Sequence, residues 1–413
     1  MKEENYLFVT NNALSYNCAN GKFILNYFQF LKPNQIFNFS IRDETDSCFN
    51  NFQISDKNVL KIFFSFGIHK FFCNKNTNNV NNKTMVSYNN KKSSLKQLLR
   101  NLVWCCSFWE TRQFKKWVKK CAPKFVVLYL GDFPYLFKVA AKISKKFGSK
   151  LLVVTGENYC FKENDYMKRC FSVSLFYKIF HRYLYKETKS IIQKCDLLIL
   201  NSPQLLELYN SKIKCKKSIY LYPQSIKNKS NKKIENGKTI LYAGNLGIER
   251  YKSLITFAKV LSEFDNEYKI KIYGNINDEI LSSLKNLSNV IYCGKVNDAD
   301  LTKAINKATF MLHVEAFDDY SKVDLMYAFS TKIAESLMLS KPLISFAPPE
   351  IISTSYLMSY NPDLTFTSEE DLIKNIKKIN SFKGYNEEQL HNFINNHCST
   401  LNSSKLKLLI EEL

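Results

Sequence analysis

Short apolar runs alternate with amphipathic segments along most of this chain, and this alternation constrains the fold more than any other feature. The run 125–130 (Phe-Val-Val-Leu-Tyr-Leu) is followed by a helical segment that ends at Gly148, and the next run starts at Leu151. Strands that alternate with helices pair in parallel through crossover connections. The pattern predicts an α/β protein with doubly wound, Rossmann-like sheets.

The pattern occurs twice, on either side of a polar segment. Residues 224–238 are rich in lysine and asparagine without an apolar period, which is typical of a linker. A chain of 413 residues is long enough for two full cores. We predict an N-terminal domain over 1–223, a C-terminal domain over 239–390, and a helical segment over 391–413 that packs back on the first domain. The strands predicted in the C-terminal domain are 239–243, 269–273, 290–293, 309–314, 342–346 and 364–367.

The segment Phe329-Ser330-Thr331-Lys332-Ile333-Ala334-Glu335 carries a distinctive pair of side chains. A helix that opens near Ser330 places Lys332 in its first turn and Glu335 on the same face one turn later. A helix N-terminus favours an anion, and a lysine there strengthens that preference. Lys332 would therefore suit a diphosphate, and Glu335 the hydroxyl pair of a ribose. A solvated ion pair without a ligand is the alternative.

Glycine-bearing loops follow predicted strands in both halves. Gly244-Asn245-Leu246-Gly247 follows the strand 239–243, with Arg250 at the mouth of the next helix. Asn20-Gly21 follows the first strand, and Gly21 is expected to open a helix that runs to about Leu31. Glycine lets a ligand approach the backbone, so both loops are candidate phosphate sites. For Gly21, an ordinary strand-to-helix turn is the alternative.

The net charge of +22 favours an anionic partner, although a compositional bias toward lysine and asparagine explains it equally well. In the segment 93–121, apolar residues and all three tryptophans recur at helical spacing between basic residues. We expect a helix, broken once, that packs on a sheet. The alternative is a basic, tryptophan-bearing face that contacts an anionic membrane. No nucleic-acid-binding module is recognisable, so nucleic acid is not an expected partner.

The twelve cysteines include no CxxC pair, which favours reduced thiols. The five histidines show no ligand spacing with cysteine, so no metal site and no cofactor are expected. No apolar run approaches the ~20 residues that cross a bilayer, and the N-terminus lacks a signal-peptide pattern. We expect a cytoplasmic location, either free or peripheral at the inner face of the membrane.

The motifs of the second half resemble the family 4 glycosyltransferases of the GT-B fold, especially those that build bacterial capsular and other cell-surface polysaccharides. The residues that carry the resemblance are Tyr242–Gly247, Arg250, His313–Phe317, Phe329–Leu337 and Lys341–Ile344. The first half matches more loosely, through Asn20-Gly21 and residues 197–202. The resemblance implies two Rossmann-like domains that face each other across a cleft.

The resemblance also implies transfer of a sugar, with retention of configuration, from a nucleotide-diphosphate sugar to a saccharide or lipid-linked saccharide. UDP is the nucleotide that the family uses most often. Arg250 and Lys332 would bind the diphosphate, Glu335 the ribose, and Glu315 would lie near the donor sugar. The remaining residues expected around the donor are Gly244, Asn245, Gly247, His313 and Ser330.

The chain departs from the family pattern at two places. Glu315 and Glu335 are twenty residues apart instead of about eight, because residues 318–328 are inserted between them. Where the family often has a histidine, the strand end reads Thr155-Gly156-Glu157-Asn158. Glu157 is therefore the candidate that orients or deprotonates an acceptor hydroxyl, with Asp132 and Asn20 as weaker ones and a loop carboxylate as the alternative.

The absence of a strand-end DxD pair predicts metal independence. Two other functions fit parts of the sequence. One is a nucleotide-sugar epimerase of the same fold, and the other is a non-catalytic basic protein that binds a membrane or nucleic acid.

Overall fold

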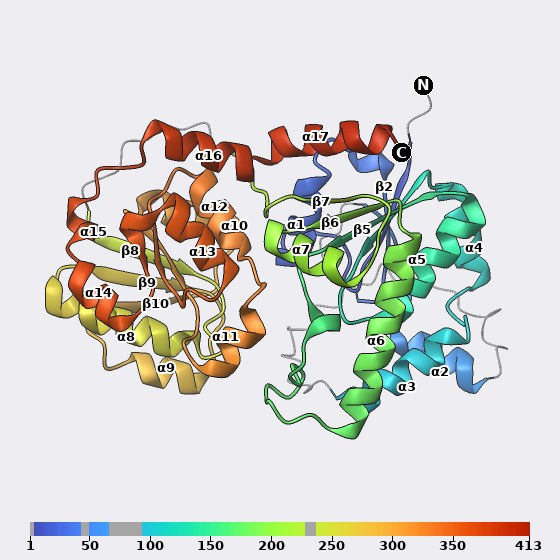
Figure 1. Ribbon diagram of the computed structural model, residues 1–413, viewed down its shortest axis with the longest axis horizontal. Helices are drawn as coiled ribbons and strands as arrows, with labels where there is room; N and C mark the ends of the chain where they lie inside the picture. Colours follow the sequence, from blue (N-terminus) through green and yellow to red (C-terminus); the bar gives the residue numbers. More distant parts are fainter. Residues whose placement is uncertain (1–3, 43–48, 66–92, 228–236) are drawn as a thin grey trace. The chain divides into compact units, whose positions relative to one another are not determined.

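The computed structural model describes residues 4–42, 49–65, 93–227 and 237–413. The chain divides into two compact units, each of which contains one parallel sheet with helices on both sides (Figure 1). Unit 1 comprises Met1–Leu221 together with Leu406–Leu413, and unit 2 comprises Tyr222–Lys405. Of the expected linker 224–238, residues 228–236 lie outside the described residues.

Unit 1 contains a seven-stranded sheet in the order β3-β2-β1-β4-β5-β6-β7, and every strand pair is parallel. Its central strands are uninterrupted apolar runs because both faces of the sheet are covered. The strands are β1 (Tyr6–Val9), β2 (Ile36–Ser40), β3 (Asn50–Gln53), β4 (Phe125–Tyr129), β5 (Lys150–Thr155), β6 (Leu197–Leu200) and β7 (Ser218–Tyr220).

The helices of unit 1 begin and end at residues that suit those positions. Ser174 and Ser202 cap two of them by accepting backbone N–H bonds, and Gly148, at φ 62°, ends a third as predicted. The helices are α1 (Ala19–Tyr27), α2 (Asp56–Phe64), α3 (Ser94–Cys105), α4 (Arg112–Cys121), α5 (Pro134–Phe147), α6 (Leu175–Lys194) and α7 (Pro203–Lys212).

Unit 2 contains a six-stranded parallel sheet in the order β10-β9-β8-β11-β12-β13. Its strands are β8 (Thr239–Ala243), β9 (Lys269–Tyr273), β10 (Val290–Gly294), β11 (Phe310–Val314), β12 (Leu343–Phe346) and β13 (Thr365–Phe366). Its helices are α8 (Arg250–Phe264), α9 (Asp278–Leu284), α10 (Asp298–Lys307), α11 (Asp319–Leu325), α12 (Thr331–Met338), α13 (Ile352–Tyr360), α14 (Glu369–Asn375), α15 (Lys378–Ser381), α16 (Glu387–His397) and, shared with unit 1, α17 (Ser399–Glu411).

Each sheet reverses its strand order at one place. In unit 1 the chain runs outward from β1 through β2 and β3, and then returns to the other side of β1 with β4. In unit 2 the same reversal occurs between β8 and β11. Ligands of doubly wound sheets bind beyond the carboxyl ends of the strands at such a switch point. The topology therefore marks the ends of β1 and β4 in unit 1, and of β8 and β11 in unit 2.

Two details of unit 1 differ from expectation. The first helix begins before Gly21, at Ala19, because the Cys18 side chain caps it, and it ends at Tyr27 rather than near Leu31. The segment 93–121 forms two helices as expected, but Trp104 and Trp109 are only 2% and 3% exposed. These two tryptophans therefore pack inward, whereas Trp117 is half-buried. No helix among the described residues is both long and apolar enough to cross a membrane.

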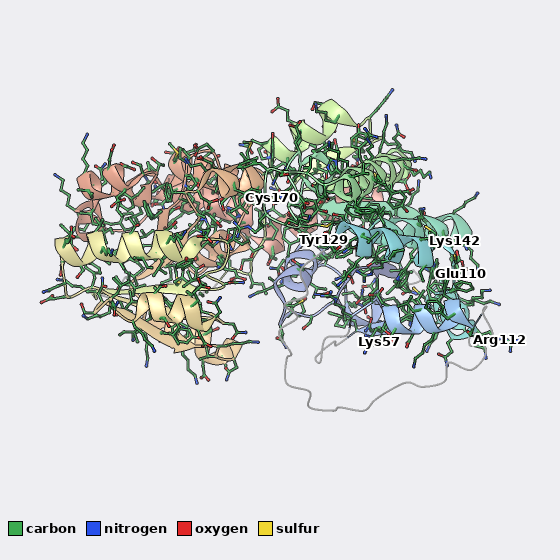
Figure 2. All side chains as sticks on the ribbon, turned by 90° about the horizontal axis from the view of Figure 1, so that it is seen from below. Lys57, Glu110, Arg112, Tyr129, Lys142 and Cys170 are labelled. Carbon is green, nitrogen blue, oxygen red and sulfur yellow. The ribbon has the colours of Figure 1, made fainter. Side chains whose placement is uncertain are left out.

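In Figure 2, Lys57 of α2 and Arg112 at the start of α4 lie at the outer edge of unit 1, and Tyr129, at the end of β4, lies farther inward.

The segment 391–413 belongs only in part to unit 1. Residues 391–405 are part of unit 2, and only Leu406–Leu413 join unit 1, where Leu406 and Ile410 are buried in the core.

Candidate functional site

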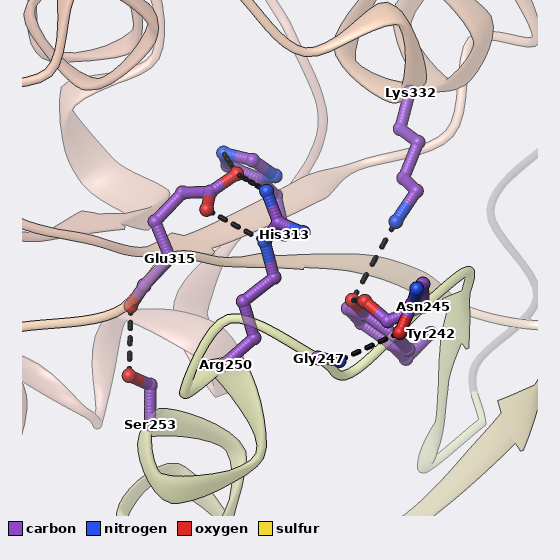
Figure 3. Close-up of polar contacts among 8 residues, drawn as sticks. All are labelled: Tyr242, Asn245, Gly247, Arg250, Ser253, His313, Glu315 and Lys332. Atoms are coloured by element: carbon purple, nitrogen blue, oxygen red, sulfur yellow. Dashed lines mark hydrogen bonds and ion pairs between the residues drawn. The ribbon is translucent and has the colours of Figure 1, made fainter. Parts of the chain in front are cut away.

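Three segments of unit 2 meet at the carboxyl ends of β8 and β11. They are the loop Gly244–Glu249 after β8, the end of β11 with Glu315, and the first turn of α12 (Figure 3). The two strands are hydrogen-bonded neighbours, so the segments that follow them lie close together. The sequence-predicted residues of the second half are thus collected at the switch point of the sheet.

The loop after β8 is held in a strained backbone conformation. Ile248 and Glu249 both have positive φ, at 61° and 59°, in the left-handed region that costs a side-chain-bearing residue of the order of 1 kcal/mol. Asn245 supports the turn, because its Oδ1 accepts a bond from the Gly247 N–H at 2.6 Å. This loop leads directly into α8 and places Arg250 at the first helical position.

Arg250 and Glu315 form a buried, two-point ion pair. Arg250 Nε donates to Glu315 Oε2 at 2.6 Å, and Nη2 donates to Oε1 at 3.2 Å. Ser253, one turn along α8, donates to the Glu315 carbonyl oxygen at 2.7 Å. Burial acts to lower the pKa of Arg250, but the Glu315 carboxylate outweighs burial and raises it. The arginine is therefore charged and held in position, with Nη1 outside the pair.

Lys332 projects from the first turn of α12 over the Tyr242 ring. Its Nζ lies 4.7 Å from the ring centroid and 3.5 Å from the Tyr242 hydroxyl. Burial, and then the positive charge of Arg250, lower the pKa of Lys332 to about 8, and Glu315 and Glu335 oppose this only partly. Two cations therefore lie close enough to repel each other, which is the arrangement that an anionic ligand would relieve.

Gly244 makes room for the lysine. Its φ is 145°, and a Cβ at this position would overlap Lys332 Nζ. Gly274, after β9, packs in turn against Gly244, since a Cβ there would overlap the Gly244 carbonyl oxygen. Both glycines are required by close approach, and Gly274 was not among the predicted site residues.

The remaining donor-site candidates lie beside this pair of cations. His313 is buried, with Nε2 3.9 Å from Glu315 Oε1, and burial lowers its pKa to about 4 despite that carboxylate. It is therefore neutral at pH 7. Ser330 is the N-cap residue of α12, and its side chain makes no capping bond. Glu335 follows Lys332 by one turn of the same helix, as predicted.

The inserted residues between the two glutamates fold as a separate short helix. It is α11, and Asp318 caps it by accepting a bond from the Ser321 N–H at 2.9 Å. The insertion therefore leaves Glu315 at its strand end and Glu335 on α12, which explains the unusual spacing of the two residues.

In unit 1, Asn20, Asp132 and Glu157 line one pocket of about 500 Å³ beyond the ends of β1, β4 and β5. Two hydrogen bonds hold the Glu157 backbone: its N–H donates to Thr155 Oγ1 at 3.1 Å, and its carbonyl oxygen accepts from the Tyr209 hydroxyl at 2.8 Å. Glu157 lies in the loop that follows β5.

Gly21 lies in the first turn of α1, where its N–H is directed at Cys18 Sγ and a Cβ would overlap the carbonyl oxygen of Ser15. The glycine therefore accommodates a close approach of this chain's own backbone. With Asn20 it also lines a small pocket beside β1.

Tyr242 and Ser253 are further site residues that sequence reasoning missed. The Tyr242 ring lies beneath Lys332 Nζ, and the Tyr242 hydroxyl donates to the Asn245 carbonyl oxygen at 2.8 Å. Ser253 was detectable in principle, because it lies three residues after Arg250 on the same helix face. Tyr242 begins the motif Tyr242–Gly247, but no role was predicted for it, and Ser253 belongs to none of the predicted motifs.

No protein-family model matches the chain, and no curated protein sequence matches it. Solved structures do resemble it. A lipopolysaccharide outer core galactosyltransferase, WaaB, in its apo form aligns at 14% identity with a TM-score of 0.56, covering 99% of this chain and 100% of that one. A glycosyltransferase from Rickettsia africae ESF-5 aligns at 14% identity with a TM-score of 0.58, covering 100% and 99%.

A pneumococcal O-GlcNAc transferase, GtfA, solved in complex with UDP and GlcNAc, aligns at 14% identity with a TM-score of 0.50, covering 72% of this chain and 59% of that one. At these identities the likeness establishes the fold. This chain has the two parallel-sheet α/β domains of the GT-B glycosyltransferases, as the sequence predicted.

Proposed function

We propose that this protein is a glycosyltransferase that moves a sugar from a nucleotide-diphosphate sugar to a saccharide or lipid-linked saccharide in the synthesis of a cell-surface polysaccharide. A UDP-sugar is the donor that we favour. We assign the protein to the family 4 type, with retention of configuration. The fold it shares with WaaB and the Rickettsia glycosyltransferase supports sugar transfer. The single observation that carries the donor site is the convergence of Arg250 and Lys332 at the switch point of unit 2.

The chemistry follows from the charges in this site. When the glycosidic bond to the donor breaks, negative charge develops on the leaving diphosphate. Lys332, Arg250 and the N-terminus of α12 would stabilise that charge in the transition state more than in the ground state, which lowers the barrier. Glu335, one turn after Lys332, would accept hydrogen bonds from the ribose hydroxyls.

The two glutamates proposed as catalytic have different tasks. Both carboxylate oxygens of Glu315 are bonded to Arg250, so we assign Glu315 to positioning that guanidinium beside the donor. Glu157 lines the pocket of unit 1 with a fixed backbone, which suits the group that orients an acceptor hydroxyl or takes its proton.

We propose that the transfer needs no metal ion, because fixed cations occupy the position where a metal would otherwise meet the diphosphate. Turnover that persists after treatment with EDTA is the expected result. Activity lost on chelation and restored by Mg²⁺ would contradict this part of the proposal.

Calorimetric titration of UDP into variant proteins tests the donor site. Lys332→Ala removes a charge-assisted contact and is expected to weaken UDP binding by about tenfold or more. Glu335→Ala is expected to weaken it by several-fold, through the ribose. Lys303→Ala is the matched control, because Lys303 forms a solvent-exposed i,i+3 ion pair with Asp300 on α10.

Equal UDP affinity in wild-type protein and all three variants would refute the site assignment. Analysis of products formed without an acceptor separates transfer from epimerisation, because only an epimerase converts the donor sugar alone. No UDP binding by any form of the protein would instead favour a non-catalytic role.

We also propose a peripheral contact with anionic membrane through 93–121, at the cytoplasmic face. Since Trp104 and Trp109 are buried, the contact would use Leu95, Leu99 and Leu102, which form one exposed stripe on α3 beside Lys96. Co-sedimentation with anionic vesicles at low salt is expected, and Leu99→Glu should abolish it. Absence of binding by the wild-type protein under these conditions would exclude the contact.

A further inference from the structure

The pocket of unit 1 at the ends of β1, β4 and β5 has a composition that the proposed function does not explain. We call it the polar pocket, and the residues that matter here are Asn11, Arg42, Lys96, Gln97, Asp132 and Glu157. Its volume of about 500 Å³ is in the range of sites for small ligands. It lies at the switch point of the unit 1 sheet, where doubly wound folds bind ligands.

Two cations of the polar pocket have no acidic partner. Arg42 and Lys96 are exposed, and within the described ranges neither side chain forms an ion pair or a hydrogen bond. Arg100, which also lines the pocket, is different because it is paired with Asp56 at 2.8 Å. The pocket therefore offers two uncommitted positive charges to an anionic group.

Buried acceptor groups line the same pocket. Gln97 is only 8% exposed, and its Oε1 has no hydrogen-bond partner in the described part of the chain. Asn11 Oδ1 is likewise buried without a partner. Asp132 is 1% exposed and accepts from the Tyr166 hydroxyl at 3.4 Å. Because an unsatisfied buried acceptor is costly, the Gln97 and Asn11 oxygens favour a partner that donates a hydrogen bond.

A nucleotide is a poor fit for the polar pocket. In the first turn of α1, a Cβ on Gly21 would overlap the Ser15 carbonyl oxygen, and the Gly21 N–H is already directed at Cys18 Sγ. No backbone cradle for a diphosphate is therefore formed by this helix. Side-chain cations together with amide and carboxylate oxygens instead match a polyhydroxylated ligand that carries one acidic group.

We propose that the polar pocket binds an acidic saccharide unit, whose carboxylate or phosphate contacts Arg42 and Lys96 and whose hydroxyls contact Gln97, Asn11, Asp132 and Glu157. This inference rests on the proposed function, since the saccharide would be the acceptor. The inference adds that the acceptor saccharide carries a negative charge. Glu157 would then contact a hydroxyl of the same saccharide unit whose carboxylate or phosphate contacts Arg42 and Lys96.

Ligand-observed NMR titration tests this directly on the full chain. The probes are glucuronic acid, glucose 6-phosphate, glucose and inorganic phosphate. At least one acidic sugar is expected to bind about tenfold more tightly than glucose, and the better of the two identifies the acid as carboxylate or phosphate. Arg42→Ala and Lys96→Ala should each remove most of that difference, whereas Lys115→Ala, an exposed charge on α4, should not.

Equal binding of glucose and both acidic sugars would overturn the proposal. If glucose 6-phosphate is the better of the two acidic sugars, inorganic phosphate that binds as tightly would also overturn the proposal, because the saccharide would then contribute nothing. Acidic sugars bound equally by the wild type and both variants would place the site elsewhere. UDP titration of the same samples separates the hypotheses, since Arg42→Ala and Lys96→Ala should leave UDP affinity unchanged if the donor site lies in unit 2.

Discussion

Lys332 is the cation of the proposed donor site whose ionisation is opposed by its surroundings. An amine usually stays charged to about pH 10, but here burial and Arg250 bring its pKa to about 8. An anionic diphosphate would oppose both effects and raise that pKa again. Ligand binding and proton uptake are therefore linked at this residue.

The sign of the linkage gives a prediction. Below about pH 8 the free protein already carries the ammonium, so UDP affinity should not depend on Lys332 ionisation. Above pH 8, binding must take up a proton, and affinity should fall by up to about tenfold per pH unit. Calorimetry at pH 9 in buffers of different ionisation enthalpy should detect this proton.

Lys332→Arg is the control for this experiment, because a guanidinium stays charged throughout the range. Its UDP affinity should show a smaller fall between pH 8 and pH 9.5. The same slope in both proteins would assign the pH dependence to another group.

At the scale of secondary-structure elements, the loop between β8 and α8 determines the geometry of the site. Ile248 and Glu249 adopt left-handed conformations, and Gly244 lies against Lys332. Strain of this kind persists only where the surrounding packing enforces it. Here the enforcing contacts are the Arg250–Glu315 pair and the bonds of Asn245.

Gly244→Ala tests whether the loop and the lysine depend on each other. The new methyl group would displace Lys332 Nζ and strain a backbone at φ 145°, so we expect a loss of about 1–3 kcal/mol in stability and weaker UDP binding. Gly148→Ala is matched to it, because Gly148 has φ 62° but no atom near the added Cβ.

That control should cost about 1 kcal/mol in thermal or urea unfolding and leave UDP affinity intact. If Gly244→Ala binds UDP as well as Gly148→Ala does, the contact between glycine and lysine has no part in the donor site.

The elements also show what a sequence can and cannot predict. β8 and β9 have the residues predicted for them, because buried parallel strands are local apolar runs with clear ends. The ion pair of Arg250 and Glu315 was not predicted, because the two residues are 65 positions apart and only the tertiary fold joins them. The burial of Trp104 and Trp109 could not be predicted for a related reason. Leucines and tryptophans both recur at helical spacing in 93–121, and the period does not say which set is buried.

At the scale of the whole molecule, two sheets of one design carry different chemistry at equivalent places. Both reverse strand order once, and both have polar residues beyond that point. Unit 2 offers glycines and two cations at helix N-termini, whereas unit 1 offers carboxylates, amides and separate cations. The fold was predictable from strand and helix alternation, but the proposed division of roles depends on strand-end side chains that only the tertiary fold brings together.

Because the chain returns to unit 1 at Leu406–Leu413, the two units differ in when they can complete their folding. Leu406 and Ile410 complete the core around β1 and β4, and they are 0% and 1% exposed. The ribosome synthesises them only after all of unit 2. Domains generally fold as units while the chain emerges, so unit 2 can mature first, whereas unit 1 must wait with an open core although its strands were made earlier. The N-terminal half is therefore the later of the two to be finished, because its core needs residues that follow unit 2 in the chain.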